Sequence, residues 1–172
     1  MSPADLRSEL SQCLSRLWRY AMVLSRKHDV ADDLVQSTCV RALERCAQIK
    51  DSTGVDRWLF SILHSIWVNE LRAQYVRQGQ GFADVDETQA PADTLSFEER
   101  HWHTQVMQRV NRLPEAQRNA VFLVYVEGFT YQEAAMTLSV PIGTIMSRLA
   151  TARLTLAKDA GTATQSQQGE KK

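Results

Sequence analysis

The fold of this chain is decided by two short segments, Thr130-Tyr131-Gln132-Glu133-Ala134-Ala135 and Val140-Pro141-Ile142-Gly143-Thr144. Thr130 can cap a helix, and Glu133, three residues later, completes a capping box. Pro141 suits the first position of a second helix, where its missing N–H costs nothing. The pattern predicts a helix-turn-helix, a common way of presenting side chains to the major groove of DNA. A helical hairpin that merely packs is the alternative.

The second helix of this pair has two distinct faces. Apolar residues recur along it at spacings of four, three and four, which predicts one buried face. They are Ile145, Leu149, Ala152 and Leu156. The opposite face carries side chains that can form hydrogen bonds with DNA, namely Thr144, Ser147, Arg148 and Thr151.

The composition of the whole chain favours a helical, water-soluble protein. Only 7 glycines and 4 prolines occur in 172 residues, which argues against a turn-rich β architecture. No apolar run approaches the roughly 18 residues needed to span a bilayer, and the N-terminus lacks the apolar segment of a signal peptide. We therefore expect a cytoplasmic protein without membrane insertion. The 3 cysteines form no close pair and are expected to be reduced.

The net charge of zero hides an uneven distribution. Residues 1–78 carry 11 basic and 9 acidic side chains, residues 79–99 carry 6 acidic and none basic, and residues 100–160 carry 7 basic and 4 acidic. An acidic middle thus separates two mildly basic ends. Neither end has the field expected of a protein that binds DNA tightly on its own, so we expect a partner to supply affinity.

Three helices are predicted before the acidic segment. The first is amphipathic, with Leu10, Leu14, Leu17, Ala21 and Leu24 on its inner face. Asp29 can cap the second, whose inner face comprises Ala31, Val35, Thr38, Ala42, Cys46 and Ile49. After a loop at residues 50–55, the third spans about residues 56–77. Its inward residues are Leu59, Ile62, Leu63, Ile66 and Leu71, and its other faces show Trp58, Phe60, Trp67 and Tyr75.

The acidic segment divides the chain into modules. Glycine, proline and small polar residues between 78 and 94 are typical of a linker. A capping box at Ser96–Glu99 restarts helix, with Val106, Met107, Val110 and Leu113 facing inward. A helix from Pro114 ends near Gly128. We predict an all-α chain of two small helical domains, at residues 1–78 and 95–159, a flexible acidic linker at 79–94 and a disordered tail at 160–172.

The outer surface of the third helix combines aromatic, polar and basic side chains. They are Arg57, Trp58, Ser61, His64, Ser65, Asn69 and Arg72. Such a surface suits single-stranded nucleic acid, because an unpaired base gains about 1–3 kcal/mol by stacking on an aromatic ring. The preceding loop, beginning at Lys50, could hold such a base. The alternative is structural, since tryptophans at helical spacing usually belong to a core.

Several motifs together resemble extracytoplasmic-function (ECF) sigma factors. Leu17–Ala21, Asp32–Gln36, Arg57–Ile62 and Asn69–Arg72 are similar to their region 2. Leu113–Arg118, Glu127–Tyr131 and Val140–Thr144 are similar to their region 4. The resemblance covers about residues 10–158, in the family's order and with its usual linker.

The resemblance implies a subunit that directs RNA polymerase to promoters and opens them. Polymerase docking on the clamp helices of the largest subunit maps onto Asp32, Asp33, Leu34 and Gln36, and a further contact falls on the flap of the second largest subunit. Recognition of the −10 element maps onto Lys50 and the outer residues of the third helix given above. Recognition of the −35 element maps onto Thr130, Ile142, Gly143, Thr144, Met146, Ser147, Arg148 and Thr151. An anti-sigma factor is a possible further partner.

The chain departs from the family where basic residues are usual. Met146, Ala150 and Thr151 stand at positions that commonly carry Lys, His or Arg, and His64-Ser65 replace Arg-Asn. Fewer phosphate anchors predict a shallow salt dependence of promoter binding. Met146 could instead touch a thymine methyl group.

Two other function classes compete with this interpretation. The missing basic residues at Met146, Ala150 and Thr151 favour a sigma mimic that sequesters an anti-sigma factor without binding DNA. The absence of a receiver-like module from the sequence argues against it. A free-standing helix-turn-helix repressor would need a dimerisation element that the sequence does not reveal. No nucleophile–base pair, phosphate loop or metal-ligand cluster is evident, so we expect neither an enzyme nor a cofactor.

Overall fold

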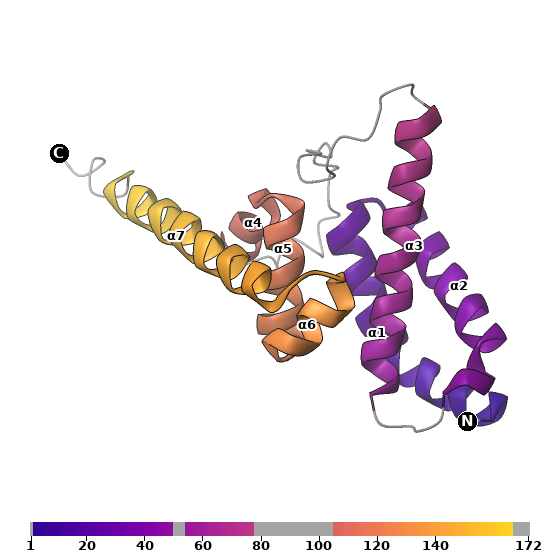
Figure 1. Ribbon diagram of the computed structural model, residues 1–172. Coiled ribbons are helices and arrows are strands. Elements are labelled where there is room, and N and C mark those ends of the chain that lie inside the picture. The colour runs from indigo at the N-terminus through magenta and orange to yellow at the C-terminus, as the bar shows by residue number, and fades with distance from the viewer. Residues whose placement is uncertain (1, 50–53, 78–104, 167–172) are drawn as a thin grey trace.

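The computed structural model describes residues 2–49, 54–77 and 105–166, with side chains from 108 to 158 in the last segment. Every regular element in these residues is a helix, as predicted (Figure 1). The elements are α1 (Pro3–Ser25), α2 (His28–Glu44), the short η1 (Cys46–Gln48), α3 (Val55–Arg77), α4 (Gln105–Arg112), α5 (Glu115–Val121), the π-helical η3 (Phe122–Val126), α6 (Tyr131–Leu138) and α7 (Ile142–Ser166). We call α1–α3 the N-terminal module and α4–α7 the C-terminal module.

The inner faces of α1 and α3 largely match the sequence periodicity. All five inward residues predicted for α3 are buried, as are four of the five predicted for α1. Leu14 was predicted to face inward but is 41% exposed. Phe60 and Trp67 were expected on the outer faces of α3, yet both are buried. The reason is that the C-terminal module packs on this side of α3.

The boundary between α1 and α2 differs slightly from the prediction. Arg26 ends α1 in the left-handed region, with φ 57°, and its N–H donates to the Met22 carbonyl. Lys27 occupies the N-cap position of α2 without a side-chain hydrogen bond, so Asp29 lies inside the first turn and does not cap the helix. Its carboxylate still interacts favourably with the positive end of the helix dipole.

The predicted helix-turn-helix is present with its capping box. The Glu133 N–H donates to Thr130 Oγ1 at 3.2 Å, and the Thr130 N–H donates to Glu133 Oε2 at 2.8 Å. The preceding helix runs through α5 and η3 and ends at Val126, two residues before Gly128, whose φ of +72° favours glycine. Pro141 stands immediately before α7, which begins one residue later than predicted.

Helix α7 is longer than the sequence suggested. Ile145, Leu149 and Ala152 are completely buried as predicted, and Leu156 is half-buried. The helix then continues away from the body of the molecule to Ser166 (Figure 1), into the segment that the sequence analysis assigned to the tail. Alanines at 157, 160 and 163 are strong helix formers, and no proline interrupts them. The predicted linker, the Ser96 capping box and residues 167–172 lie outside the described residues.

The two modules share one apolar core in this structure. A single cluster of buried residues runs through both. The Tyr20 ring stacks on Phe122 with 5.6 Å between centroids, and Phe60 meets Phe129 edge-on at 5.3 Å. Aromatic pairs of this kind favour close packing beyond the area they bury. The helix-turn-helix is therefore docked on the N-terminal module.

Candidate nucleic-acid and polymerase interfaces

The first turns of α7 form an exposed surface. Ile142 and Met146 are 38% and 48% exposed, and they lie one helical turn apart. Gly143, Ser147 and Thr151 are also exposed, while Thr144 and Arg148 are half-buried. Thr130 is exposed at the start of α6. The residues expected to contact the −35 element are thus gathered on the helix-turn-helix, and only Arg148 among them carries a positive charge.

The outer surface of α3 is divided between exposed and covered residues. Ser65, Asn69 and Arg72 are exposed and follow one another at spacings of four and three, so they share one face. Trp58 is half-buried and packs against the apolar core. Lys50, expected to belong to the same site, lies outside the described residues. The exposed face is therefore smaller than the one predicted from the sequence.

His64 faces the interior instead of solvent. Its Nδ1 lies 3.1 Å from the hydroxyl of Tyr20, which is itself completely buried. Burial, with a smaller contribution from the charge of Arg148, lowers the pKa of His64 to about 4. The imidazole is consequently neutral at neutral pH and supplies no charge to a phosphate.

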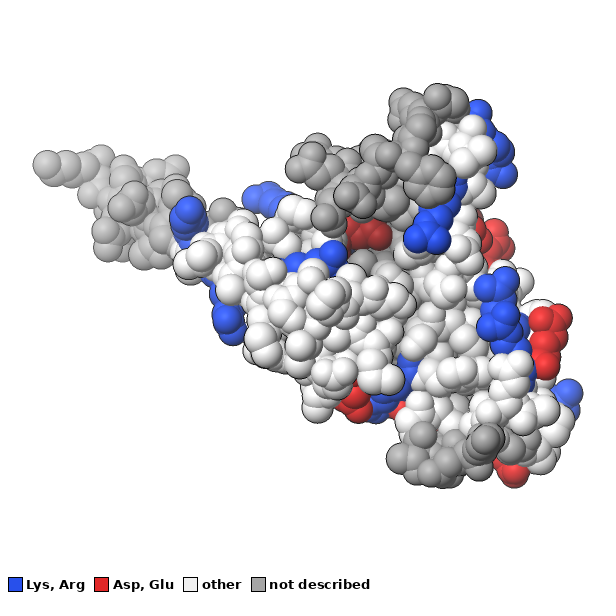
Figure 2. All heavy atoms as spheres, viewed as in Figure 1, with Lys and Arg blue, Asp and Glu red and all other residues white. Residues whose placement is uncertain are grey.

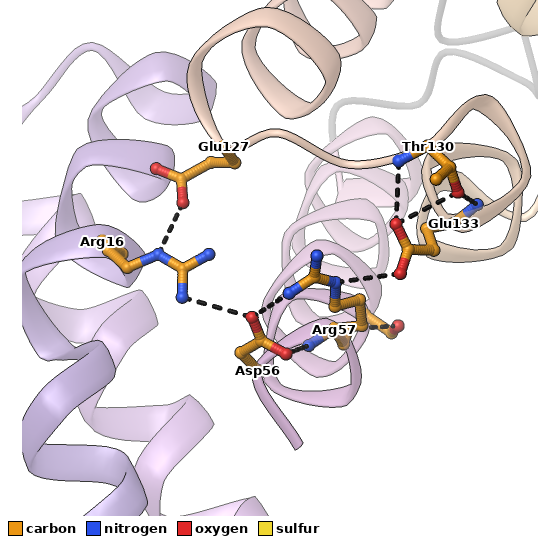
Figure 3. A network of polar contacts seen from close by, with 7 residues as sticks. Arg16, Asp56, Arg57, Glu127, Thr130 and Glu133 are labelled. Carbon is orange, nitrogen blue, oxygen red and sulfur yellow. Dashed lines mark hydrogen bonds and ion pairs between the residues drawn. The ribbon is translucent and has the colours of Figure 1, made fainter. Parts of the chain in front are cut away.

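Arg57, at the start of α3, is bound to the helix-turn-helix. Its Nε donates to Glu133 Oε1 at 3.1 Å (Figure 3), and its guanidinium carbon lies 4.7 Å from the centre of the Phe129 ring. The other end of the guanidinium contacts Asp56. Ser61, one turn further along α3, donates its hydroxyl hydrogen to the Arg57 carbonyl at 2.9 Å. Two predicted −10 residues are thus engaged within the protein.

Asp56 connects this arginine with a second one. Arg16, from α1, donates to Asp56 Oδ2 at 3.2 Å and to Glu127 Oε2 at 2.7 Å (Figure 3). Partial burial alone would raise the pKa of Asp56, but the Arg57 N–H and the two guanidinium groups outweigh it and lower that pKa below its ordinary value. Asp56 is therefore charged at neutral pH and lies between two cations.

A second group of polar contacts joins the modules near the start of α5. The Trp67 indole N–H donates to Glu115 Oε1 at 2.7 Å. The buried Arg118 donates from Nε to the Val23 carbonyl of α1 and from a terminal nitrogen to the Leu113 carbonyl, each at 2.9 Å. Burial lowers the pKa of Arg118 to about 10, which still leaves it charged at neutral pH. This cation fixes the C-terminal module to the end of α1.

The expected polymerase-docking residues of α2 are mostly exposed. Asp32, Asp33 and Gln36 face solvent, and Asp32 accepts a hydrogen bond from the Trp18 indole at 2.9 Å. Leu34 was included in the same site, but its side chain is completely buried. It belongs to the core that supports α2 and presents no surface to a partner here.

The charged side chains on the face of the molecule seen in Figure 2 are scattered. Figure 2 shows basic side chains spread over one face without forming a single dense patch. Within residues 2–49, 54–77 and 105–166 no group of histidine, cysteine and acidic side chains is arranged to hold a metal ion. In the same residues, no helix is both long and apolar enough to cross a membrane.

The contacts that join the modules were not predicted from the sequence, although Glu115, Arg118 and Glu127 lie in the motifs that resemble region 4. Arg16, Glu115, Arg118 and Glu127 each occupy positions where a solvated charge is the ordinary expectation. Glu133 was predicted only as a capping residue. Their partners are distant in sequence, and helical periodicity reports nothing about such contacts.

Comparison with known proteins places both modules. The family model described as "Sigma-70, region 4" matches residues 103–156, and the model described as "Sigma2 domain of PhyR" matches residues 10–64. The ECF RNA polymerase sigma factor EcfG of Rhodopseudomonas palustris is 33% identical over 155 residues, which cover 87% of this chain and 81% of the relative.

Two solved structures resemble the whole chain. The sigma factor RpoE of Bartonella quintana, in complex with the anti-sigma factor NepR, is 30% identical with a TM-score of 0.68, over 90% of this chain and 95% of that one. The anti-anti-sigma factor PhyR, complexed with NepR from the same organism, is 15% identical with a TM-score of 0.54, over 90% of this chain and 51% of that one. The second likeness shows a shared fold.

Proposed function

The chain belongs to the ECF family of RNA polymerase sigma factors, and we propose that it binds core RNA polymerase and directs promoter recognition and opening. The observation that carries the proposal is the capped helix-turn-helix, whose recognition helix exposes its first turns while the N-terminal module exposes the acidic start of α2. Family membership also supports a regulatory role in transcription without catalysis.

We assign polymerase docking to α2. Asp32, Asp33 and Gln36 are exposed on this helix, where two carboxylates near the helix start can pair with basic side chains of a partner. The clamp helices of the largest subunit are the proposed partner, and the flap of the second largest subunit would contact the C-terminal module. We also propose that the polymerase-docking domain ends at residue 78 and that the helix-turn-helix domain begins at residue 95.

We assign the −35 element to α7 and the −10 element to α3. The exposed residues Met146, Ser147 and Thr151 would face bases or phosphates in the major groove. On α3, the exposed Ser65, Asn69 and Arg72 would contact the opened strand. Two weak contacts on one chain, held together on polymerase, raise each other's effective concentration.

Reconstituted transcription tests this function. The purified chain is added to core polymerase, and run-off transcripts are sought from promoters upstream of its own regulon. Asp33→Lys should abolish polymerase binding with an unchanged circular-dichroism spectrum. Glu44→Lys, at the other end of α2, makes the same charge change and should leave binding intact. Unchanged binding of the Asp33 variant would remove the docking assignment.

A sigma mimic is the second candidate, and a specific observation favours it. The model that matches residues 10–64 is that of the PhyR sigma2 domain. Such a chain would bind an anti-sigma factor of the NepR type and would form no holoenzyme. Binding to that anti-sigma factor, together with failure of run-off transcription, would decide for the mimic. A sigma factor that is itself inhibited would bind the anti-sigma factor and also support transcription without it.

A further inference from the structure

We propose that the ion-pair network between α1, the start of α3 and the helix-turn-helix is an intramolecular latch, which holds the chain closed and withholds its promoter-binding surfaces. The network comprises Arg16, Arg19, Asp56, Arg57, Glu127 and Glu133. The regulatory meaning of the latch rests on the proposed sigma function. The closed state itself can be tested without polymerase or DNA.

Glu127 is the part of the latch that is withdrawn furthest from water. Its side chain is only 2% exposed, and it accepts hydrogen bonds from Arg16 at 2.7 Å and Arg19 at 3.5 Å. The chain turns at Gly128, directly after it, and Phe129 then enters the shared core. A carboxylate buried in this way needs its cations, because burying an unpaired charge is costly. The docked arrangement supplies both of them from α1.

Arg57 makes closure and promoter binding compete. Its guanidinium is held on one side by Asp56 and on the other by Glu133 of the C-terminal module. The donors that pair with these carboxylates are the same ones that would pair with a phosphate. While Arg57 is paired with Glu133, its guanidinium cannot offer all of its donors to DNA at the expected −10 site. A ligand that binds only the open state therefore has a lower apparent affinity, in proportion to the fraction of molecules that are open.

The ion pairs of the latch can separate without unfolding either module. The side chains of Arg16, Arg57 and Glu133 are 29%, 34% and 36% exposed, so water and salt reach them. Exposed pairs of this kind contribute little individually and are screened by ions. Each charged group can be hydrated after separation. The capping box of Thr130 and Glu133 lies within the C-terminal module and would survive opening.

Glu127→Lys is the direct test, because neither Glu127 nor Arg16 belongs to the proposed DNA or polymerase sites. Small-angle X-ray scattering on the full chain should show a larger radius of gyration and maximum dimension for this variant than for wild type. Glu44→Lys, an equal charge change on α2, should retain the wild-type values. Circular dichroism verifies that each variant keeps its helices.

Binding to promoter DNA in the presence of core polymerase forms the second arm. If closure withholds the −10 surface, the complex of Glu127→Lys with core polymerase should bind promoter DNA about tenfold more tightly than the wild-type complex, since apparent affinity scales with the open fraction. An expanded wild type, or a Glu127→Lys variant that stays folded and compact, would overturn the latch. Expansion without any gain in affinity would overturn its inhibitory role. Absence of polymerase binding by every variant would instead reject the proposed sigma function, whatever the scattering shows.

Discussion

The recognition helix α7 and the outer face of α3 were both expected to touch promoter DNA, and they differ in what covers them. The first turns of α7 face solvent, whereas the start of α3 lies against the helix-turn-helix and pairs with Glu133 through Arg57. An arginine that can bind a phosphate can equally bind a carboxylate. A basic and aromatic helix face therefore predicts an anionic partner, but this partner can be DNA or a carboxylate of the same chain.

Removal of Arg118 should have the largest effect, because this residue fixes the C-terminal module, which covers the start of α3, to α1. We expect Arg118→Met to lower the free energy of unfolding by about 3–5 kcal/mol, since it leaves the Val23 and Leu113 carbonyl groups without their charged donor and removes a positive charge near the half-buried Glu115. Urea denaturation measures the loss. Arg118→Lys should not restore stability, because a lysine cannot reproduce two directed N–H donors. Arg112→Met, at an exposed position, serves as the control.

Acid should also lower the stability of the folded chain, through protonation of His64. The pKa of this imidazole is near 4 in the folded chain and 6.5 when unperturbed, so the unfolded state binds more protons between these values. Stability should therefore fall as pH drops from 6.5 toward 4, by about 3 kcal/mol at most. Thermal unfolding across this range measures the slope. It should flatten in His64→Phe and persist in His28→Gln, and equal slopes in both variants would contradict the assignment.

Loss of the helix cap at Thr130 should lower stability by a smaller amount. Thr130→Ala removes the side-chain acceptor for the Glu133 N–H and should cost about 1 kcal/mol of stability. Chemical denaturation measures the cost. Thr155→Ala, which removes a hydroxyl from α7, should cost less because that hydroxyl bonds only a carbonyl within its own helix.

The smallest expected effects come from changing the charge of the exposed face of α7. Met146→Lys should strengthen −35 duplex binding at low salt and steepen the salt dependence by about one unit, because one more phosphate contact releases one more counterion. Arg148→Ala should weaken duplex binding across sequences. Fluorescence anisotropy over a salt series measures both. Val40→Lys, an exposed site on the N-terminal module, controls for net charge, and a slope change equal to that of Met146→Lys would refute the placement.

Local rules predicted much of the fold. The capping box at Thr130 and the inward residues of α3 follow from spacing and hydrogen-bonding capacity within a few residues. These features depend on neighbours along the chain, which the sequence displays directly. The exposed first turns of α7 were predicted for the same reason.

Contacts between distant segments were not predictable in this way. Phe60 and Trp67 were expected outside because periodicity assigns one buried face to a helix, whereas α3 is packed from more than one side. Leu34 was grouped with its acidic neighbours by motif, although its apolar side chain packs inward. Arg16 and Glu127 are 111 residues apart, and no pattern in either helix couples them.

Glu133 has a consequence for genetics. It closes the capping box through one carboxylate oxygen and holds Arg57 through the other, so a substitution there damages two traits at once. A selection for hyperactive alleles should therefore not recover substitutions of Glu133, because a substitution that releases Arg57 also destabilises the start of α6. Glu127 carries no capping duty, and hyperactive alleles should accumulate there instead.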